Sequence, residues 1–405
     1  MMIRACVNSD ARMSAETFNQ ILAVQLDGLD QIHQRRARRA VIPVDATHVE
    51  IDGRLHVNFA GNNYLGLTHH PAVLQAVVNA TASHGFGSGA APLVAGYTDL
   101  HATAEKNIAR WKGTEDAVLL SSGFQANEAA IGAMATVATT AGKSVRFLLD
   151  KLAHASLIDA VRSTGMPFRV FPHNGLSKLR RLLQDADAGQ LQVVVTESIF
   201  SMDGDAADLK ALVDLKQEHP FILLLDEAHG AGVYGPDGAG YAAELGLHHA
   251  VDISIVTLSK ALGGIGGAIC GSKRWCDAVV NFGRAYLFST SLPPAVTAAA
   301  SAAIEVLRAE PSRQARVRAV SLRVREKLRT AGLRIPDGDS PIIPIILGSE
   351  EAALNASSAL QERGLLVVAI RPPTVPRGGS RLRVTLSCEH TDDEMDRLIE
   401  GLLVP

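Results

Sequence analysis

Two polar motifs follow apolar runs in the middle of the chain. Asp226 and His229 lie in the motif Asp-Glu-Ala-His-Gly, directly after the run Phe-Ile-Leu-Leu-Leu. Lys260 follows the run Ile-Ser-Ile-Val by a few residues and precedes a glycine-rich stretch. α/β proteins bind ligands at the carboxyl ends of their parallel strands, which is where these side chains would lie. The motifs therefore predict a ligand site that brings a carboxylate, an imidazole and an amine together.

Each motif alone has a plainer interpretation, because Asp226 could cap a turn and Lys260 could be a surface lysine. Taken together they fit one chemistry. A buried amine is costly unless it is paired or covalently bonded. A Schiff base between Lys260 and pyridoxal 5′-phosphate removes that cost, and Asp226 would keep the pyridinium nitrogen protonated as an electron sink. We therefore predict pyridoxal 5′-phosphate as the cofactor.

Other polar residues follow further apolar runs. In Ser-Ser-Gly-Phe-Gln-Ala-Asn the chain turns from a strand into a helix at Gly123 and Phe124. The free N–H groups of a helix start suit a phosphate, although an ordinary turn has the same pattern. His154 follows the run Arg-Phe-Leu-Leu-Asp and could stack on a cofactor ring, whereas a lone histidine is more often structural. Hydroxyl groups placed to contact the same ligand belong to Ser201, Thr257, Ser289 and Thr290.

A sheet is needed to bring these residues together. Between residues 71 and 225 short, nearly all-apolar segments alternate with helical ones, and residues 252–259 continue the series. This alternation predicts an α/β fold with a mostly parallel sheet covered on both faces. After Pro293-Pro294 an Ala-rich helix leads into a smaller α+β unit. We expect an N-terminal helix and hairpin segment at 1–58, a large cofactor-binding domain at 59–295 and a small C-terminal domain at 296–405.

The N-terminal segment has patterns of its own. Residues up to about Ser14 predict a loose leader, and apolar spacing predicts a helix from there to Ala40. That helix would end in the basic cluster 35–39, which is either a solvated face or an anion contact. Asp52-Gly53, flanked by alternating residues, predicts a hairpin turn.

Composition excludes several classes of protein. The 405 residues carry a net charge of −3, so no global basic field favours nucleic acid. Four cysteines without a C-x-x-C pair indicate reduced thiols, and without an H-E-x-x-H motif we predict no metal site. The N-terminus lacks the apolar region of a secretory signal, and the apolar runs are too short to span a bilayer. We expect a cytoplasmic protein with neither nucleic-acid nor membrane partners.

The ordered motifs resemble those of one enzyme family. They are SSGFQAN, DKLAHASL, ESIFSMDGD, DEAHG, TLSKALGG and FSTSLPP. The set is similar to that of the α-oxoamine synthases, which are fold-type I pyridoxal phosphate enzymes, and the similarity extends from about Asn58 to the C-terminus. IRPPTVP, which begins at Ile370, and NFAGNNYLGLTHHP most resemble the biotin-pathway branch of the family. The resemblance implies the fold-type I transferase fold and a homodimer with active sites at the subunit interface.

The resemblance also implies a role for each candidate residue. Lys260 would hold the cofactor and act as general base, Asp226 would bind the pyridinium nitrogen, and His229 would bind the ring hydroxyl. His154 would stack on the ring and contact substrate. The other cofactor contacts would be Gly123, Phe124, Ser201 and Thr257, with Ser289 and Thr290 reaching the neighbouring subunit's cofactor. The other substrate contacts would be Arg36 (or Arg38), Asn62, Thr374 and Arg383, of which Arg383 would grip the amino-acid carboxylate.

The reaction implied is a decarboxylative condensation of L-alanine with an acyl thioester. In the biotin pathway the thioester is pimeloyl-CoA or its carrier-protein equivalent, and the products are 8-amino-7-oxononanoate, CoA and CO2. Another synthase of the family, such as a glycine C-acetyltransferase, is the alternative, followed by an aminotransferase and by a non-catalytic or nucleotide-binding protein. Pro92 and Leu258-Ser259 depart from the family pattern, and both departures bear on the acyl substrate.

Overall fold

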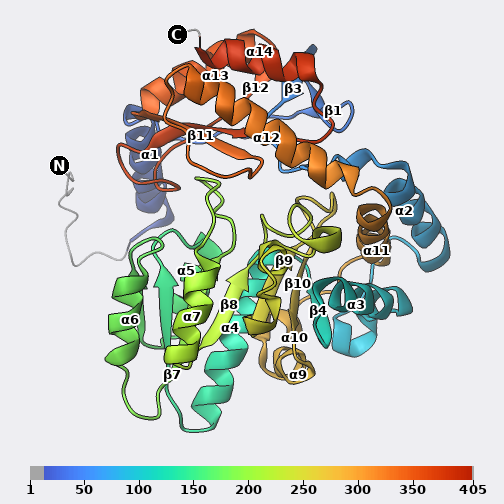
Figure 1. Ribbon diagram of the computed structural model, residues 1–405, viewed down its shortest axis with the longest axis vertical. Coiled ribbons are helices and arrows are strands. Elements are labelled where there is room, and N and C mark those ends of the chain that lie inside the picture. The colour runs from blue at the N-terminus through green and yellow to red at the C-terminus, as the bar shows by residue number, and fades with distance from the viewer. Residues whose placement is uncertain (1–12, 404–405) are drawn as a thin grey trace.

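The computed structural model describes residues 13–403. Cys6 and almost all of the leader predicted up to Ser14 lie outside the described residues. Figure 1 shows a large sheet with its helices in the lower part of the molecule and a smaller assembly of strands and helices above it.

The large sheet has seven strands in the order β4-β10-β9-β8-β7-β5-β6. Their bounds are β4 Asp116–Leu120, β5 Val145–Asp150, β6 Phe168–Phe171, β7 Leu191–Glu197, β8 Ile222–Asp226, β9 Ile253–Thr257 and β10 Gly267–Gly271. Strands β6, β5, β7, β8 and β9 pair in parallel. Along β5, Phe147 and Leu149 pack in one core cluster and Leu148 in another, because successive side chains face opposite ways. The predicted mostly parallel sheet with two covered faces is confirmed.

Helices cover both faces of this sheet (Figure 1). α4 and α5 pack on one face, where α9 joins them, while α6 and α7 pack on the other. The helix bounds are α2 Pro71–His84, α3 Asp99–Lys112, α4 Gly123–Thr140, α5 Ala155–Ser163, α6 Leu176–Gln184, α7 Leu209–Glu218, α8 Tyr241–Glu244, α9 Lys273–Phe282, α10 Arg284–Leu287 and α11 Pro294–Ala309.

Strand β10 was not predicted, because its glycines disfavour a strand. It runs antiparallel to both neighbours, β4 and β9. The glycines are explained by packing against the start of α4. A Cβ atom at Gly267 would lie 2.6 Å from the Ser122 carbonyl oxygen and 2.7 Å from Gly123 Cα. Only a residue without a side chain lets these backbones approach so closely.

The C-terminal unit has a three-stranded antiparallel sheet in the order β11-β14-β13. The strands are β11 Ile342–Gly348, β13 Val368–Ile370 and β14 Ser380–Thr385, and the helices are α12 Ser312–Thr330, α13 Glu350–Glu362 and α14 Asp392–Leu403. All of these elements contribute to one core cluster except β13. This arrangement is the smaller α+β unit that the sequence predicted.

The predicted hairpin is present and joins the C-terminal unit. Strands β2 His48–Ile51 and β3 Arg54–Asn58 are connected by a turn in which Asp52 and Gly53 have φ angles of 50° and 76°. These left-handed angles are typical of a two-residue hairpin loop. The sheet order is β1-β2-β3-β12, with β1 Ile42–Pro43 and β12 Leu365–Leu366. The parallel β3–β12 pairing therefore joins the hairpin to a strand of the C-terminal part of the chain. The domain boundaries at 58 and 295 stay a prediction.

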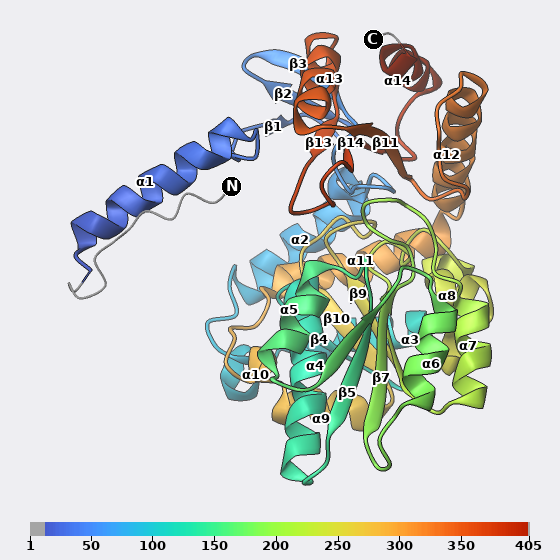
Figure 2. The same ribbon diagram turned by 90° about the vertical axis from the view of Figure 1, so that its left-hand side faces the viewer.

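Helix α1, Ala15–Gln31, projects away from the rest of the molecule (Figure 2). None of its residues is buried. It ends before the Ala40 that apolar spacing predicted, because the chain turns at His33, whose φ is 53°. The basic cluster after it then runs along the C-terminal unit, where Arg39 donates a hydrogen bond to Gln361.

Candidate active site

The carboxyl ends of four neighbouring parallel strands meet at one edge of the large sheet. Strands β5, β7, β8 and β9 end at Asp150, Glu197, Asp226 and Thr257. Glu197 and Asp226 are direct partners in the β7–β8 register. Most of the predicted site residues lie at this edge or in the loops that follow it.

Lys260 and His229 form the centre of this arrangement. Lys260 Nζ lies 2.7 Å from His229 Nε2, and His229 Nδ1 lies 2.6 Å from the hydroxyl of Tyr64. Burial lowers the pKa of Lys260 to about 8, although the negative charge of Asp226 acts in the opposite direction. Burial, with the Lys260 charge second, holds the pKa of His229 well below its ordinary value. The amine is thus partly neutral near pH 8, beside a neutral imidazole.

A guanidinium group continues this chain of polar contacts. Tyr64 donates to Asn62 Oδ1 at 3.2 Å, and both terminal nitrogens of Arg383 donate to the same oxygen at 3.2 Å. Arg383 Nε donates to the backbone carbonyl of Ser201 at 2.7 Å. Its position on β14 brings a cation from the C-terminal unit to the edge of the large sheet. A planar guanidinium in this place suits a carboxylate ligand.

Asp226 is held by a second network of hydrogen bonds. Asn127 donates to Asp226 Oδ2 and to Ser156 Oγ, each at 2.9 Å. The Ser156 hydroxyl lies 2.7 Å from Nδ1 of His154, which also accepts from the Ser156 backbone N–H at 3.2 Å. Burial lowers the pKa of His154, so the imidazole is neutral and carries its proton on Nε2. Asp226 and His154 are therefore positioned by one buried amide, that of Asn127.

Glu197 is a second carboxyl group beside Asp226. It is 2% exposed, and its Oε1 has no hydrogen-bond partner. Burial, followed by the charge of Asp226, raises the pKa of Glu197 well above its ordinary value. The side chain thus adds a neutral carboxyl group, rather than a second negative charge, to the floor of the site.

The start of α4 forms an anion cradle next to this edge. Ser122 caps the helix by accepting from the N–H of Gln125, which leaves the first N–H groups, those of Gly123 and Phe124, without helical acceptors. A Cβ atom at Gly123 would lie 3.4 Å from Thr257 Oγ1, so the hydroxyl borders the cradle. Gln125 also donates to Ser289 Oγ at 3.3 Å within the same chain. The reach of Ser289 and Thr290 to a neighbouring subunit stays a prediction.

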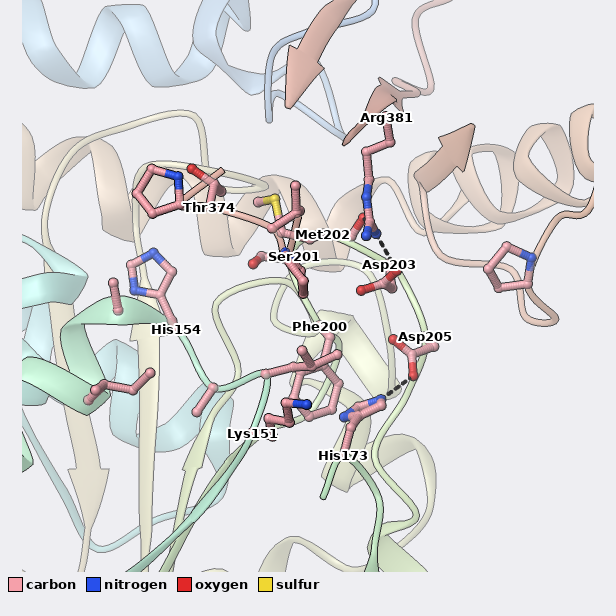
Figure 3. Close-up of a pocket in the computed structure, with 18 residues that line it drawn as sticks. Lys151, His154, His173, Phe200, Ser201, Met202, Asp203, Asp205, Thr374 and Arg381 are labelled. Carbon is pink, nitrogen blue, oxygen red and sulfur yellow. Dashed lines mark hydrogen bonds and ion pairs between the residues drawn. The ribbon is translucent and has the colours of Figure 1, made fainter. Parts of the chain in front are cut away.

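A cavity of about 930 Å³ opens between the loops of the large sheet and the C-terminal unit (Figure 3). His154 and Ser201 line the cavity from the loops of the large sheet, and Thr374 lines it from the C-terminal unit. Arg36 donates to the carbonyl of Pro372, next to the lining segment. Of the predicted substrate contacts, His154 and Thr374 line this cavity, whereas Asn62 and Arg383 do not. Arg36 is anchored at the rim of the cavity.

Sequence reasoning missed several residues of the site. Glu197 ends an apolar strand just as Asp226 does, so the same reasoning could have found it. Asn127 lies one helical turn after Gly123, but nothing in the sequence indicates that it faces Asp226. Tyr64 comes from a loop outside the sheet, and only the folded chain shows its contact with His229.

These features match known proteins. The family model of aminotransferases of class I and II matches residues 56–402. The chain belongs to this family. It is 42% identical over 381 residues to the 8-amino-7-oxononanoate synthase of Anaeromyxobacter dehalogenans (strain 2CP-1), which covers 94% of both chains.

Solved structures agree with this membership. A serine palmitoyltransferase variant from S. paucimobilis, solved with a bound PLP–myriocin aldimine, superposes with a TM-score of 0.88 at 28% identity, covering 97% of this chain and 98% of that one. The 8-amino-7-oxononanoate synthase of Francisella tularensis superposes with a TM-score of 0.74 at 27% identity, covering 86% and 97%. The fold-type I fold and the enzyme class are confirmed, and the predicted cofactor agrees with these relatives.

The side chains at the sheet edge fit pyridoxal 5′-phosphate. A carboxylate, an imidazole and an amine of low pKa lie beside a helix start with free N–H groups, and Asn127 Oδ1 is buried without a partner. Within residues 13–403 no cluster of three or more His, Cys, Asp or Glu side chains could hold a metal ion. None of the helices described there has the length and apolar character needed to span a bilayer.

Proposed function

We propose that this enzyme condenses L-alanine with a pimeloyl thioester, carried by CoA or by a carrier protein, to give 8-amino-7-oxononanoate, CO2 and the free thiol. The observation that carries the proposal is the contact of Lys260 with His229 at the sheet edge where Asp226 also lies, together with the hydrogen bond from Arg383 to the Ser201 carbonyl in a loop at that edge. This set provides an amine, a pyridinium partner and a carboxylate partner in one site. The relatives named 8-amino-7-oxononanoate synthase support the choice of substrates.

Each part of the cofactor has a matching group in the chain. Asp226 would hold the ring nitrogen, His229 the ring hydroxyl, and His154 the face of the ring. Gly123 and Phe124 would hold the phosphate through their N–H groups, with Ser201 and Thr257 nearby. When bound, pyridoxal 5′-phosphate supplies an aldehyde for an amine and a ring that withdraws electrons from the amino acid's α-carbon.

The protein's own groups then handle the proton and the carboxylate. Lys260, which is substantially neutral near pH 8, would take the α-proton of alanine and later return a proton to the product. Arg383 and Asn62 would bind the alanine carboxylate until it leaves as CO2. Overall, a bond would form between the alanine α-carbon and the acyl carbon, the thioester bond would break, and the thiol would leave with a proton. The bond between the α-carbon and the carboxylate would break to release CO2, and a proton would take the place of the carboxylate.

The acyl thioester would occupy the cavity lined by Ser201 and Thr374, with Arg36 at its rim. We further propose a cytoplasmic homodimer in which Ser289 and Thr290 complete the neighbour's phosphate site. The exposed side chains of Phe86 and Phe288, 81% and 73% accessible, support a covered interface in the assembled enzyme.

The test is release of CO2 and free thiol by the cofactor-loaded enzyme. L-Alanine with pimeloyl-CoA is compared with glycine plus acetyl-CoA, and each amino acid is also tested without a thioester. The proposal predicts stoichiometric CO2 and thiol with alanine and pimeloyl-CoA alone. Release only with glycine and acetyl-CoA would assign the glycine C-acetyltransferase alternative, and a keto acid without CO2 would assign an aminotransferase.

A further inference from the structure

We propose that Lys151 forms the subsite for an anionic group at the far end of the acyl chain, and that it selects ω-carboxylated acyl thioesters over plain ones. The inference rests on the proposed function. The product 8-amino-7-oxononanoate carries its carboxylate at the end of the chain opposite the ketone. The enzyme therefore has to accommodate an apolar chain that ends in a negative charge.

The 930 Å³ cavity has a mostly apolar wall, which suits an apolar acyl chain. His154 and Thr374, which are predicted to contact the substrate, are among the residues that line it. Its surface is largely apolar, with contributions from Leu152, Ile158, Phe200, Met202 and Val375. An acyl chain that leaves the reacting carbon would be shielded from water along this wall.

Lys151 supplies the charge at the wall of the same cavity. It follows Asp150, the last residue of β5, and it shares with His154 the short loop before α5 (Figure 3). Lys151 is one of the residues that line the cavity, and it is exposed rather than buried among other side chains. A carboxylate needs a cation when its surroundings are apolar, and a lysine provides one on a flexible stem.

The other cations that line the cavity are already paired. Arg381 forms an ion pair with Asp203 (Figure 3). His173 lies between two carboxylates, 3.1 Å from Asp150 and 2.7 Å from Asp205. Over the described residues, 13–403, Lys151 makes no ion pair, which leaves it as the cavity cation that can receive a ligand's carboxylate.

The experiment compares pimeloyl-CoA with heptanoyl-CoA, which has the same chain length but no terminal carboxylate. Lys151→Met is assayed beside Lys151→Arg and the matched control Lys143→Met, whose exposed lysine precedes β5 at the opposite edge of the sheet. We expect Lys151→Met to raise KM for pimeloyl-CoA about tenfold and to leave KM for heptanoyl-CoA unchanged. Lys151→Arg should retain the preference, and Lys143→Met should behave as wild type.

Because both thioesters carry CoA, comparing them also distinguishes the terminal carboxylate of the acyl chain from the phosphates of CoA as the anion that Lys151 binds. An equal rise in both KM values would place a CoA phosphate at Lys151 and overturn the proposal. An unchanged preference in Lys151→Met, or its loss only in Arg36→Met, would overturn it as well. If wild type turns over neither thioester, the proposed function fails, and calorimetric binding of the two thioesters to wild type and Lys151→Met then decides the role of Lys151.

Discussion

The hydroxyl of Tyr64 lies 2.6 Å from Nδ1 of His229, on the side of the imidazole away from Lys260. Tyr64 is fully buried, and burial raises its pKa to about 12, so it stays protonated. Because its one O–H donates to Asn62 Oδ1, its oxygen accepts from the Nδ1–H of His229. Tyr64 and Arg383 also donate hydrogen bonds to the same oxygen, Oδ1 of Asn62. Tyr64 is therefore a positioning residue that fixes the orientation and tautomer of His229.

Tyr64→Phe should lower kcat/KM roughly three- to tenfold, because the bond that orients His229 is lost. The pH profile of kcat should shift as well, since His229 contacts the Lys260 amine. Steady-state assays from pH 6.5 to 9.5 measure both effects. Tyr234→Phe is the matched control, because that hydroxyl bonds to Asp339 away from the site. A pH profile identical to wild type would show that Tyr64 has only a packing role.

Arg383→Lys should raise KM for L-alanine about tenfold or more, because a planar two-nitrogen contact with the carboxylate is replaced by a point charge. KM for the acyl thioester should change little and serves as the internal control. Both values come from initial rates of thiol release with one substrate varied. If the thioester KM rose instead, Arg383 would belong to the acyl site.

Lys260 should react as an amine with a pKa near 8 rather than at its ordinary value of 10.5, because burial disfavours its charged form. In apoprotein freed of cofactor, the rate of capture of pyridoxal 5′-phosphate should therefore rise as the pH passes through about 8. Stopped-flow absorbance from pH 6.5 to 9.5 follows this directly. A rate that increases only toward pH 10.5 would show an amine that the site does not perturb.

His173 should stabilise the fold in a pH-dependent manner. Burial alone would lower its pKa, but the bonds to Asp150 and Asp205 raise it to about 10 from 6.5. The stabilisation is thus complete below pH 6.5 and is lost as the pH rises toward 10. His173→Gln should lose about 1–3 kcal/mol at pH 6 and little at pH 10, as measured by denaturant unfolding. The exposed His249→Gln should leave both values unchanged, and an equal loss at the two pH values would contradict the ion-pair account.

The sequence allowed the large sheet and the residues at its edge to be predicted for one physical reason. Apolar strands that end in polar residues bring those residues together, as Asp226, Thr257 and His154 illustrate. The same reasoning cannot predict the positions of residues that come from other parts of the chain, such as Tyr64 from a loop or Arg383 from the C-terminal unit. Strand β10 was missed because its glycines serve close packing against α4 rather than strand propensity. The pairing of β3 with β12 depends on contacts between distant segments, which periodicity does not report.

The most direct test of the central claim is to trap the cofactor on its lysine. The purified yellow enzyme is treated with borohydride, digested and mapped by mass spectrometry, beside Lys260→Ala and Lys151→Met prepared in the same way. The account predicts one pyridoxyl label, on the peptide that contains Lys260, in wild type and in Lys151→Met, and no label in Lys260→Ala. A label on any other lysine, or a label that persists in Lys260→Ala, would contradict it.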